Sequence, residues 1–282
     1  MLEISGTTRI FPVIGWPVEQ VKAPALFNAY FMQHNIDARV IPLKVRPEAY
    51  IAAVRMLMSM DNVGGILVSI PHKPMSVDAV GQPTARALLA GACNAIYQAA
   101  DGHTLVGDLI DGEGFIRAFD RTCGEQAFPW DTAQALVVGS GGVGCAVAAS
   151  LAARGIRQVA IYDTRSQQAE ALQARLQQAY PATRIVIAPP RAAGYDLVVN
   201  STPLGMHADD PLPVDLDGVS PSCIVVDCGM KIEMSKLLSE AQRRGCRIQK
   251  GKEMLIEQAP LYLELFGWPG VSSDAFRALE AL

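Results

Sequence analysis

Short apolar runs alternate with amphipathic stretches along most of the chain. Residues 11–15 form an apolar run that ends in glycine, and apolar side chains then recur at helical spacing over residues 23–34. The same alternation predicts further strands at 38–43, 65–70, 135–138, 158–162, 183–188, 197–200 and 223–227, and further helices at 48–60, 84–89, 142–154, 166–178, 235–244 and 252–266. Segments 94–97 and 104–107 are typical of a hairpin turned at Asp101-Gly102. Strands that alternate with helices form right-handed βαβ units, so the expected fold class is α/β with parallel sheets covered on both faces.

The composition fits a folded chain with one large or two medium domains. Half of the 282 residues are apolar and 18% are charged, a balance that can bury a sizeable core. The 24 basic and 28 acidic residues give a net charge of −4, without any block of like charge. Nucleic acid is therefore not an expected partner.

The cysteines and the N-terminus indicate a cytoplasmic protein. The cysteines are scattered, without a CxxC pair or neighbouring histidines, which predicts reduced, buried thiols and no metal site. The first residues lack the basic start and long apolar run of a secretory signal. Residues 132–153 carry no charge and are long enough to cross a bilayer, but the four glycines in this stretch favour a different interpretation and no membrane contact is expected.

Those glycines form a G-x-G-x-x-G loop between a predicted strand and an alanine-rich helix. The loop reads Gly139-Ser140-Gly141-Gly142-Val143-Gly144. In this setting the first glycine permits the tight turn, the second lets the backbone approach a pyrophosphate, and the third lets helix and strand pack closely. The helix N-terminus adds free N–H groups for the phosphates. The loop therefore predicts a dinucleotide site, the alternative being a glycine-rich turn in another kind of α/β protein.

The end of the next strand bears on which dinucleotide binds. Asp163 lies about twenty residues beyond the loop, where a carboxylate accepts hydrogen bonds from ribose hydroxyls and repels a 2′-phosphate. Arg165, two residues further on, could instead pair with that phosphate. We expect NAD as the preferred cofactor, with NADP as the alternative.

A nicotinamide enzyme that oxidises an alcohol needs a group that takes the hydroxyl proton. No serine-tyrosine-lysine arrangement or zinc-ligand set stands out. Lys73, in Ser69-Ile70-Pro71-His72-Lys73, and Asp111, in Asp111-Gly112-Glu113-Gly114-Phe115, would each be typical surface charges if taken alone.

With these segments included, the chain resembles the shikimate and quinate/shikimate dehydrogenase family over nearly its whole length. The matching segments are Val13-Ile14-Gly15-Trp16-Pro17, 65–73, Gly91-Ala92-Cys93-Asn94-Ala95, 107–115, the glycine loop, Asn200-Ser201-Thr202-Pro203-Leu204-Gly205-Met206 and 251–258. The resemblance implies a substrate domain, residues 1–110 completed by the C-terminal helices of 251–282, and a Rossmann-type dinucleotide-binding domain, residues 111–250.

The resemblance also implies roles for individual residues. Lys73 and Asp111 would form the catalytic pair, with the carboxylate orienting the ammonium group. Asn94, Gln258 and Ser69 would contact the substrate. Asn200, Thr202, Met206 and Gly251 would lie by the cofactor, with Thr202 and Met206 near its nicotinamide end.

Several polar positions of the family's substrate pocket are apolar here. Val21-Lys22-Ala23 stands where the family has a serine-x-serine that grips the substrate carboxylate. The family's asparagine and threonine before the lysine appear as Leu67 and Ser69, its asparagine-threonine before the aspartate as Leu109-Ile110, and a pocket tyrosine as Met230. Buried groups that lose their partners cost on the order of 1–3 kcal/mol each. Shikimate should therefore bind poorly, unless Gln20, Lys22 or His72 replaces the lost contacts.

These observations predict a shikimate dehydrogenase-like enzyme that acts on a small hydroxylated substrate, cyclic and less polar than shikimate. The alternatives are a genuine quinate/shikimate dehydrogenase of aromatic amino acid biosynthesis with a rebuilt carboxylate pocket, and a non-catalytic dinucleotide-binding regulatory module. A tetrahydrofolate dehydrogenase would share the architecture but fits the ordered motifs less well. The expected state is a monomer or homodimer.

Overall fold

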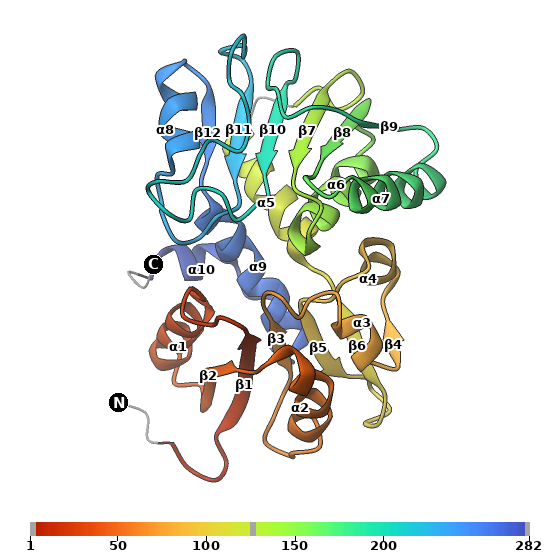
Figure 1. Ribbon diagram of the computed structural model, residues 1–282. Helices are drawn as coiled ribbons and strands as arrows, with labels where there is room; N and C mark the ends of the chain where they lie inside the picture. Colours follow the sequence, from red (N-terminus) through yellow and green to blue (C-terminus); the bar gives the residue numbers. More distant parts are fainter. Residues whose placement is uncertain (1–3, 125–127, 280–282) are drawn as a thin grey trace. The chain divides into compact units, whose positions relative to one another are not determined.

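The computed structural model describes residues 4–124 and 128–279, which form two compact α/β units (Figure 1). The first unit comprises Met1–Ile110 and Leu255–Leu282, and the second comprises Asp111–Met254. The division falls within helix α9 (Gly251–Leu265). The expected fold class is confirmed.

The first unit is built on a six-stranded mixed sheet in the order β2-β1-β3-β5-β6-β4. Its strands are β1 (Arg9–Gly15), β2 (Ala38–Lys44), β3 (Ile66–Val68), β4 (Gln82–Pro83), β5 (Ala95–Gln98) and β6 (Leu105–Asp108). Only β5 runs antiparallel to its two neighbours. The carboxyl ends of the other five strands therefore share one edge with the amino end of β5.

Alternating residues of these strands belong to hydrophobic cores on the two faces of the sheet. Phe11, Val13 and Leu67 belong to a cluster shared with α1 (Ala23–Gln33), α9 and α10 (Ser273–Arg277). Ile14 and Val68 belong to a second cluster, shared with α2 (Tyr50–Leu57) and α3 (Ser76–Ala79). The remaining helices of this unit are the 3₁₀ turn η1 (Pro47–Ala49) and α4 (Ala85–Ala90).

The second unit holds a six-stranded, all-parallel sheet in the order β12-β11-β10-β7-β8-β9. Its strands are β7 (Gln134–Val138), β8 (Gln158–Tyr162), β9 (Arg184–Ile187), β10 (Leu197–Asn200), β11 (Ile224–Asp227) and β12 (Arg247–Gln249), and its helices are α5 (Asp111–Cys123), α6 (Gly142–Ala153), α7 (Ser166–Ala179) and α8 (Lys236–Arg243). The strand order reverses between β7 and β10. In open α/β sheets, ligands bind at the carboxyl ends of the strands at such a switch point.

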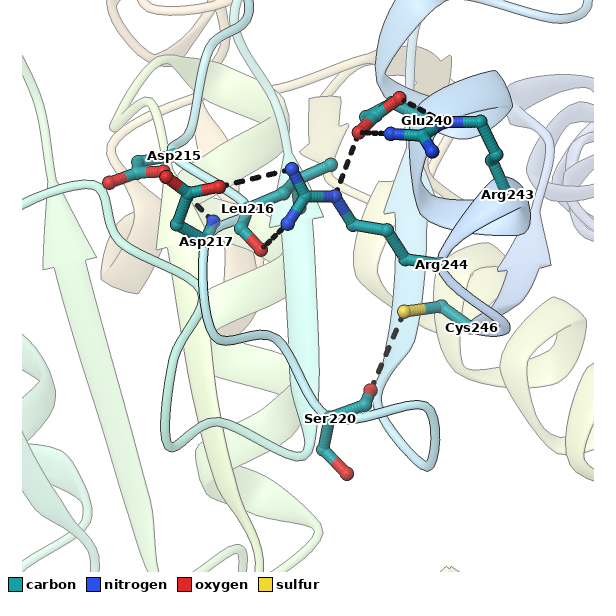
Figure 2. A network of polar contacts seen from close by, with 8 residues as sticks. All are labelled: Asp215, Leu216, Asp217, Ser220, Glu240, Arg243, Arg244 and Cys246. Atoms are coloured by element: carbon teal, nitrogen blue, oxygen red, sulfur yellow. Dashed lines mark hydrogen bonds and ion pairs between the residues drawn. The ribbon is translucent and has the colours of Figure 1, made fainter.

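A long connection between β10 and β11 is held in place by α8. Residues 209–222 contain no helix or extended strand. The Arg244 guanidinium donates to the Leu216 carbonyl oxygen over 2.8 Å and to Asp217 Oδ1 over 3.0 Å, and its Nε lies 2.8 Å from Glu240 Oε1 (Figure 2). The loop is thus fastened to Arg244, the residue that directly follows α8.

Five elements were not anticipated from the pattern: α3, β4, α5, β12 and α10. Helix α5 contains Gly112 and Gly114, which lower helix propensity. Gly112 is nevertheless required, because an added Cβ would collide with Ser150 and lie 2.6 Å from the Ala146 carbonyl oxygen of α6. Close packing of α5 on α6 thus overrides local preference.

Two other expectations can be compared with the structure. The uncharged segment 132–153 is β7, the glycine loop and α6, and no helix among residues 4–124 and 128–279 is long and apolar enough to cross a membrane. All six cysteines are free, and five of them are buried: Cys93, Cys123, Cys145, Cys223 and Cys246. Cys228 is half-buried, which corrects the expectation for that residue.

Candidate functional site

The glycine loop lies at the switch point of the second unit. Gly139 follows β7 with a φ of +97°, and an added Cβ there would lie 2.9 Å from Thr202 Cγ2. A Cβ on Gly144 would collide with the Gly139 carbonyl oxygen, so the third glycine permits the helix to start this close to the turn. Above Gly141 a Cβ would meet nothing within 4 Å. This open space at the N-terminus of α6 fits a pyrophosphate group.

Asp163 follows β8 beside this loop. Its Oδ2 accepts hydrogen bonds from the backbone N and Oγ of Ser140, at 2.8 and 2.7 Å. Its Oδ1 accepts from the backbone N and the Nε of Arg165, at 2.9 and 3.4 Å. Burial opposes the ionisation of Asp163, but the hydrogen bonds from Arg165 and Ser140 outweigh it and lower its pKa. The site therefore presents a carboxylate with an exposed guanidinium against it.

The segment after β10 is held by the buried side chain of Asn200. Asn200 Oδ1 accepts from the backbone N and Oγ1 of Thr202, at 3.0 and 2.7 Å, and its Nδ2 donates to the Leu204 carbonyl oxygen over 2.9 Å. These bonds fold residues 200–204 back on themselves. Thr202 and the half-buried Met206 are carried on this segment, at the carboxyl edge of the same sheet as the glycine loop.

Gly251 begins α9 where that helix contacts the end of β11. A Cβ on Gly251 would collide with the Gly229 carbonyl oxygen and lie 3.0 Å from the Asp227 carbonyl oxygen. Close packing between the helix start and this strand end is therefore sufficient to explain the glycine.

At the carboxyl edge of the first unit, Lys73 follows a tightly anchored turn. The Ser69 backbone N donates to the Ile14 carbonyl oxygen, and the Lys73 carbonyl oxygen accepts from the Cys93 backbone N over 2.9 Å. The imidazole of His72 is buried, stacks on Tyr50 at a centroid distance of 4.4 Å and places its Nε2 2.8 Å from the Val45 carbonyl oxygen. His72 is thus enclosed, which disfavours it as a replacement contact for a substrate carboxylate.

Asn94 lies next to this turn and is fully buried. Its Oδ1 accepts from the Ile110 backbone N over 2.9 Å, and its carbonyl oxygen accepts from Tyr262 Oη over 3.2 Å. Its Nδ2 has no hydrogen-bond partner among the described residues. The amide is therefore held in one orientation with a donor available.

Four of the apolar replacements in the predicted substrate pocket come together in one hydrophobic cluster of the first unit. Ala23, Leu67 and Ile110 are buried members of this cluster, and Val21 packs against it. We call these four residues the apolar quartet. Helix α9 contributes Ile256, Ala259 and Tyr262 to the same cluster. Positions distant in sequence thus form one continuous apolar region.

The other expected site residues occupy varied environments. Asp111 is buried and begins α5 in the second unit, whereas Lys73 belongs to the first unit. Gln258 is buried on α9, and Met230 is half-buried after β11. Gln20 donates to the Pro17 carbonyl oxygen over 3.0 Å, and Lys22 is exposed at the start of α1.

Two buried carboxylates at the carboxyl edges were missed in the sequence. Asp108 accepts from Arg86 Nε and Nη2, both over 2.6 Å, and from Thr84 Oγ1. Asp227 ends β11 beside Asn200. Each directly ends a buried strand, and that position was the available signal.

Known sequence families match much of this chain. The family described as the shikimate dehydrogenase substrate binding domain matches residues 13–96, and the one described as shikimate / quinate 5-dehydrogenase matches residues 122–206. The chain belongs to the shikimate dehydrogenase family. It is accordingly an NAD(P)-dependent oxidoreductase, which confirms the expected enzyme class.

Relatives of similar length support this assignment. Shikimate dehydrogenase (NADP(+)) of Rhodospirillum rubrum is 33% identical over 285 residues, covering 99% of this chain and 98% of that protein. The protein of the same name from Paracoccus denitrificans is 34% identical over 278 residues, covering 95% of each.

Solved structures of this fold have different substrates and cofactors in their names. Shikimate 5-dehydrogenase from Listeria monocytogenes, in complex with shikimate and NAD, superposes with a TM-score of 0.86 at 22% identity and covers 98% of each chain. Quinate dehydrogenase from Corynebacterium glutamicum, in complex with NAD, gives 0.82 at 22% identity. 5-Ketofructose reductase from Gluconobacter gives 0.83 at 22% identity. These two cover 96% of this chain and 97% of their own.

Proposed function

We propose that this family member transfers hydride between NAD and a small hydroxylated substrate, cyclic and without a carboxylate, with Lys73 and Asp111 as the acid–base pair. The observation that carries the proposal is the apolar quartet, Val21, Ala23, Leu67 and Ile110, within one buried cluster. A carboxylate that entered this region would lose its water without gaining hydrogen bonds. Shikimate and quinate are therefore poor substrates.

The range of substrates within this fold is compatible with such a change. A structural neighbour is named for 5-ketofructose, a sugar and not a carboxylic acid, as the compound it reduces. The curated relatives named for shikimate favour the other candidate, a genuine shikimate or quinate dehydrogenase with a rebuilt pocket. In that case the exposed Lys22 or Gln20 supplies the carboxylate contact.

The proposed roles use groups at the carboxyl edge of each sheet. Lys73 exchanges the proton of the reacting hydroxyl and Asp111 orients the ammonium group. The Nδ2 group of Asn94 donates to a second substrate oxygen, and Ser69 and Gln258 contribute further polar contacts. The bound nicotinamide cofactor supplies the hydride acceptor or donor.

NAD is the proposed cofactor because Asp163 presents a carboxylate where the adenosine ribose would lie. The same carboxylate would repel the 2′-phosphate of NADP. Arg165 is already engaged with Asp163, so it is less available to that phosphate. The curated relatives are named for NADP(+), which makes the comparison of the two cofactors a direct test.

A spectrophotometric screen of cofactor reduction tests the proposed function. The unmodified chain, Lys73→Met and Asp111→Asn are assayed with NAD and NADP against shikimate, quinate and carboxylate-free cyclic and acyclic polyols. We expect activity with a polyol, and a loss on the order of 10²–10⁴-fold in either variant without a change in NAD affinity.

Lys236→Met, at an exposed position on α8, is the matched control and should retain full activity. Full turnover by Lys73→Met would refute the assigned base. Binding of NAD without turnover of any compound would favour the regulatory module. Efficient turnover of shikimate would favour the biosynthetic enzyme.

A further inference from the structure

Asp227 is a buried carboxylate in the dinucleotide-binding unit to which the proposed mechanism gives no role. It is the last residue of β11 and is 3% exposed. Its Oδ1 accepts from Asn200 Nδ2 over 3.1 Å and from the Gly229 backbone N over 2.9 Å. Its Oδ2 accepts from Ser235 Oγ over 2.6 Å. The carboxylate therefore has donors on both oxygens.

These donors come from two different segments at the carboxyl edge of the sheet. Asn200 holds the segment 200–206 through its own bonds to Thr202 and Leu204. Gly229 and Ser235 belong to the segment 228–235 between β11 and α8, which also carries Met230. Asp227 is thus the group that joins the two segments, and Gly205 lies close enough that its added Cβ would be 3.4 Å from Asp227 Oδ2.

A carboxylate at this position is costly to bury and difficult to replace. Burial raises the pKa of Asp227, and the described residues contain no cation that pairs with it. All three of its partners are donors in the observed arrangement. An asparagine would keep one acceptor oxygen for Asn200 and Gly229, but its NH₂ group would reverse the bond to Ser235 Oγ and leave the buried Ser235 hydroxyl proton without its acceptor. The cost is understandable if both segments must be held in a single arrangement.

We propose that Asp227 is a positioning residue for hydride transfer: it locks segment 200–206 against segment 228–235. Three side chains are thereby fixed together: Thr202 and Met206, which the family resemblance places near the nicotinamide, and Met230, which it places in the substrate pocket. The proposal rests on the proposed function. It differs from a purely structural role because the loss of Asp227 should weaken only the binding of the nicotinamide end of the cofactor.

Comparing NAD with ADP-ribose, which lacks the nicotinamide, tests this distinction. Calorimetric titration of Asp227→Asn should show ADP-ribose affinity within about twofold of the unmodified chain and NAD affinity about fivefold to tenfold weaker. Turnover should fall on the order of 10²-fold, the cost of a small misplacement of reacting groups. A merely structural defect would lower the affinities for NAD and ADP-ribose to the same extent.

Variants at Asp196 and Ser235 serve as controls for this test. Asp196→Asn removes charge from a half-buried aspartate at the opposite end of β10, where its carboxylate accepts from the Gln134 backbone N, and should leave both affinities unchanged. Ser235→Ala should weaken NAD binding and turnover in the same way as Asp227→Asn, but to a smaller extent. Ser235→Thr keeps the hydroxyl and should therefore retain the NAD affinity and turnover of the unmodified chain.

The outcomes separate this proposal from the proposed function. Equal effects of Asp227→Asn on NAD and ADP-ribose, or no effect on NAD and turnover, would overturn the positioning role alone. Failure of the unmodified chain to bind either ligand would overturn the proposed function, and the positioning role with it.

Discussion

A single buried imidazole next to the proposed base links stability to pH. Burial of His72 lowers its pKa below the ordinary value of 6.5. As pH falls through about 6.5, the unfolded chain takes up a proton at His72 that the folded chain resists, so this contribution to stability is present above that pH and lost below it.

We therefore predict that His72→Gln flattens the fall in stability between about pH 7 and pH 5. Urea denaturation at several pH values measures the slope. The exposed His103→Gln should keep the steep dependence of the unmodified chain. If stability falls with pH equally steeply in the unmodified chain and in His72→Gln, His72 does not govern the pH dependence of stability.

Gln249 is a second buried polar residue, and its side-chain amide is buried without hydrogen bonds that would compensate for the loss of water. It ends β12 at 2% exposure, and neither amide atom has a hydrogen-bond partner among the described residues. An unsatisfied buried group costs about 1–3 kcal/mol. Gln249→Leu should accordingly raise the free energy of unfolding by ~1–2 kcal/mol.

Gln177→Leu is the matched comparison for that measurement. Gln177 donates to the Thr183 carbonyl oxygen and accepts from the Ile185 backbone N, so the same substitution removes two bonds. It should destabilise the protein. Equal destabilisation by both substitutions in chemical denaturation would show that the Gln249 amide is satisfied after all.

At the scale of elements, Arg244 is the side chain that links the loop 209–222 to Glu240 of α8. Arg244 bonds to the loop at Leu216 and Asp217, whereas the two side-chain bonds of Arg243 go to Glu240 on its own helix (Figure 2). Arg244→Ala should therefore speed proteolytic cleavage within 209–222 severalfold, and Arg243→Ala should not. Identical cleavage of the two variants would assign the order of this loop to other contacts.

How far elements could be predicted depended on their length and on where their stabilising contacts lie. Strands β7, β8, β9, β10 and β11 are apolar runs, and helices α7 and α8 carry periodic apolar residues, so the local pattern was sufficient. Strands β4 and β12 have two and three residues, too few to show a period. Helix α5 contains Gly112, which packing on α6 requires, and this is a tertiary cause that no local pattern contains.

At the scale of the whole molecule, Lys73 and Asn94 lie at the carboxyl edge of the first unit's sheet, and the glycine loop, Asp163 and Asn200 lie at that of the second. Sequence motifs could predict the glycine loop, Asp163 and Lys73, because each lies in a contiguous segment. The apolar quartet could be recognised only position by position. Its members meet in one cluster because α1, β3 and the segment after β6 share a core. Asp227 was missed because its two side-chain partners are 27 and 8 residues away.

The cofactor preference involves the second unit alone. Asp163→Ala should weaken the binding of NAD more than the binding of NADP, and so narrow the difference between the two affinities. The ribose hydroxyls of NAD lose an acceptor, whereas the 2′-phosphate of NADP loses a repelling charge. Calorimetric titration of both cofactors measures the ratio. Tighter binding of NADP to the unmodified chain would show that Arg165 governs the site.

Substrate choice is the property that the apolar quartet should control. Val21→Ser with Ala23→Ser should raise kcat/KM for shikimate relative to the compound found in the screen, because the two hydroxyls can donate to a carboxylate. The gain should be partial, since Leu67 and Ile110 remain apolar in the same cluster. Burying two hydroxyls should also lower stability by about 1–3 kcal/mol per group left unpaired, visible in denaturation without substrate. An unchanged ratio of the two kcat/KM values would mean that carboxylate recognition lies elsewhere, and a loss of shikimate turnover in Lys22→Met would then identify Lys22 as the contact.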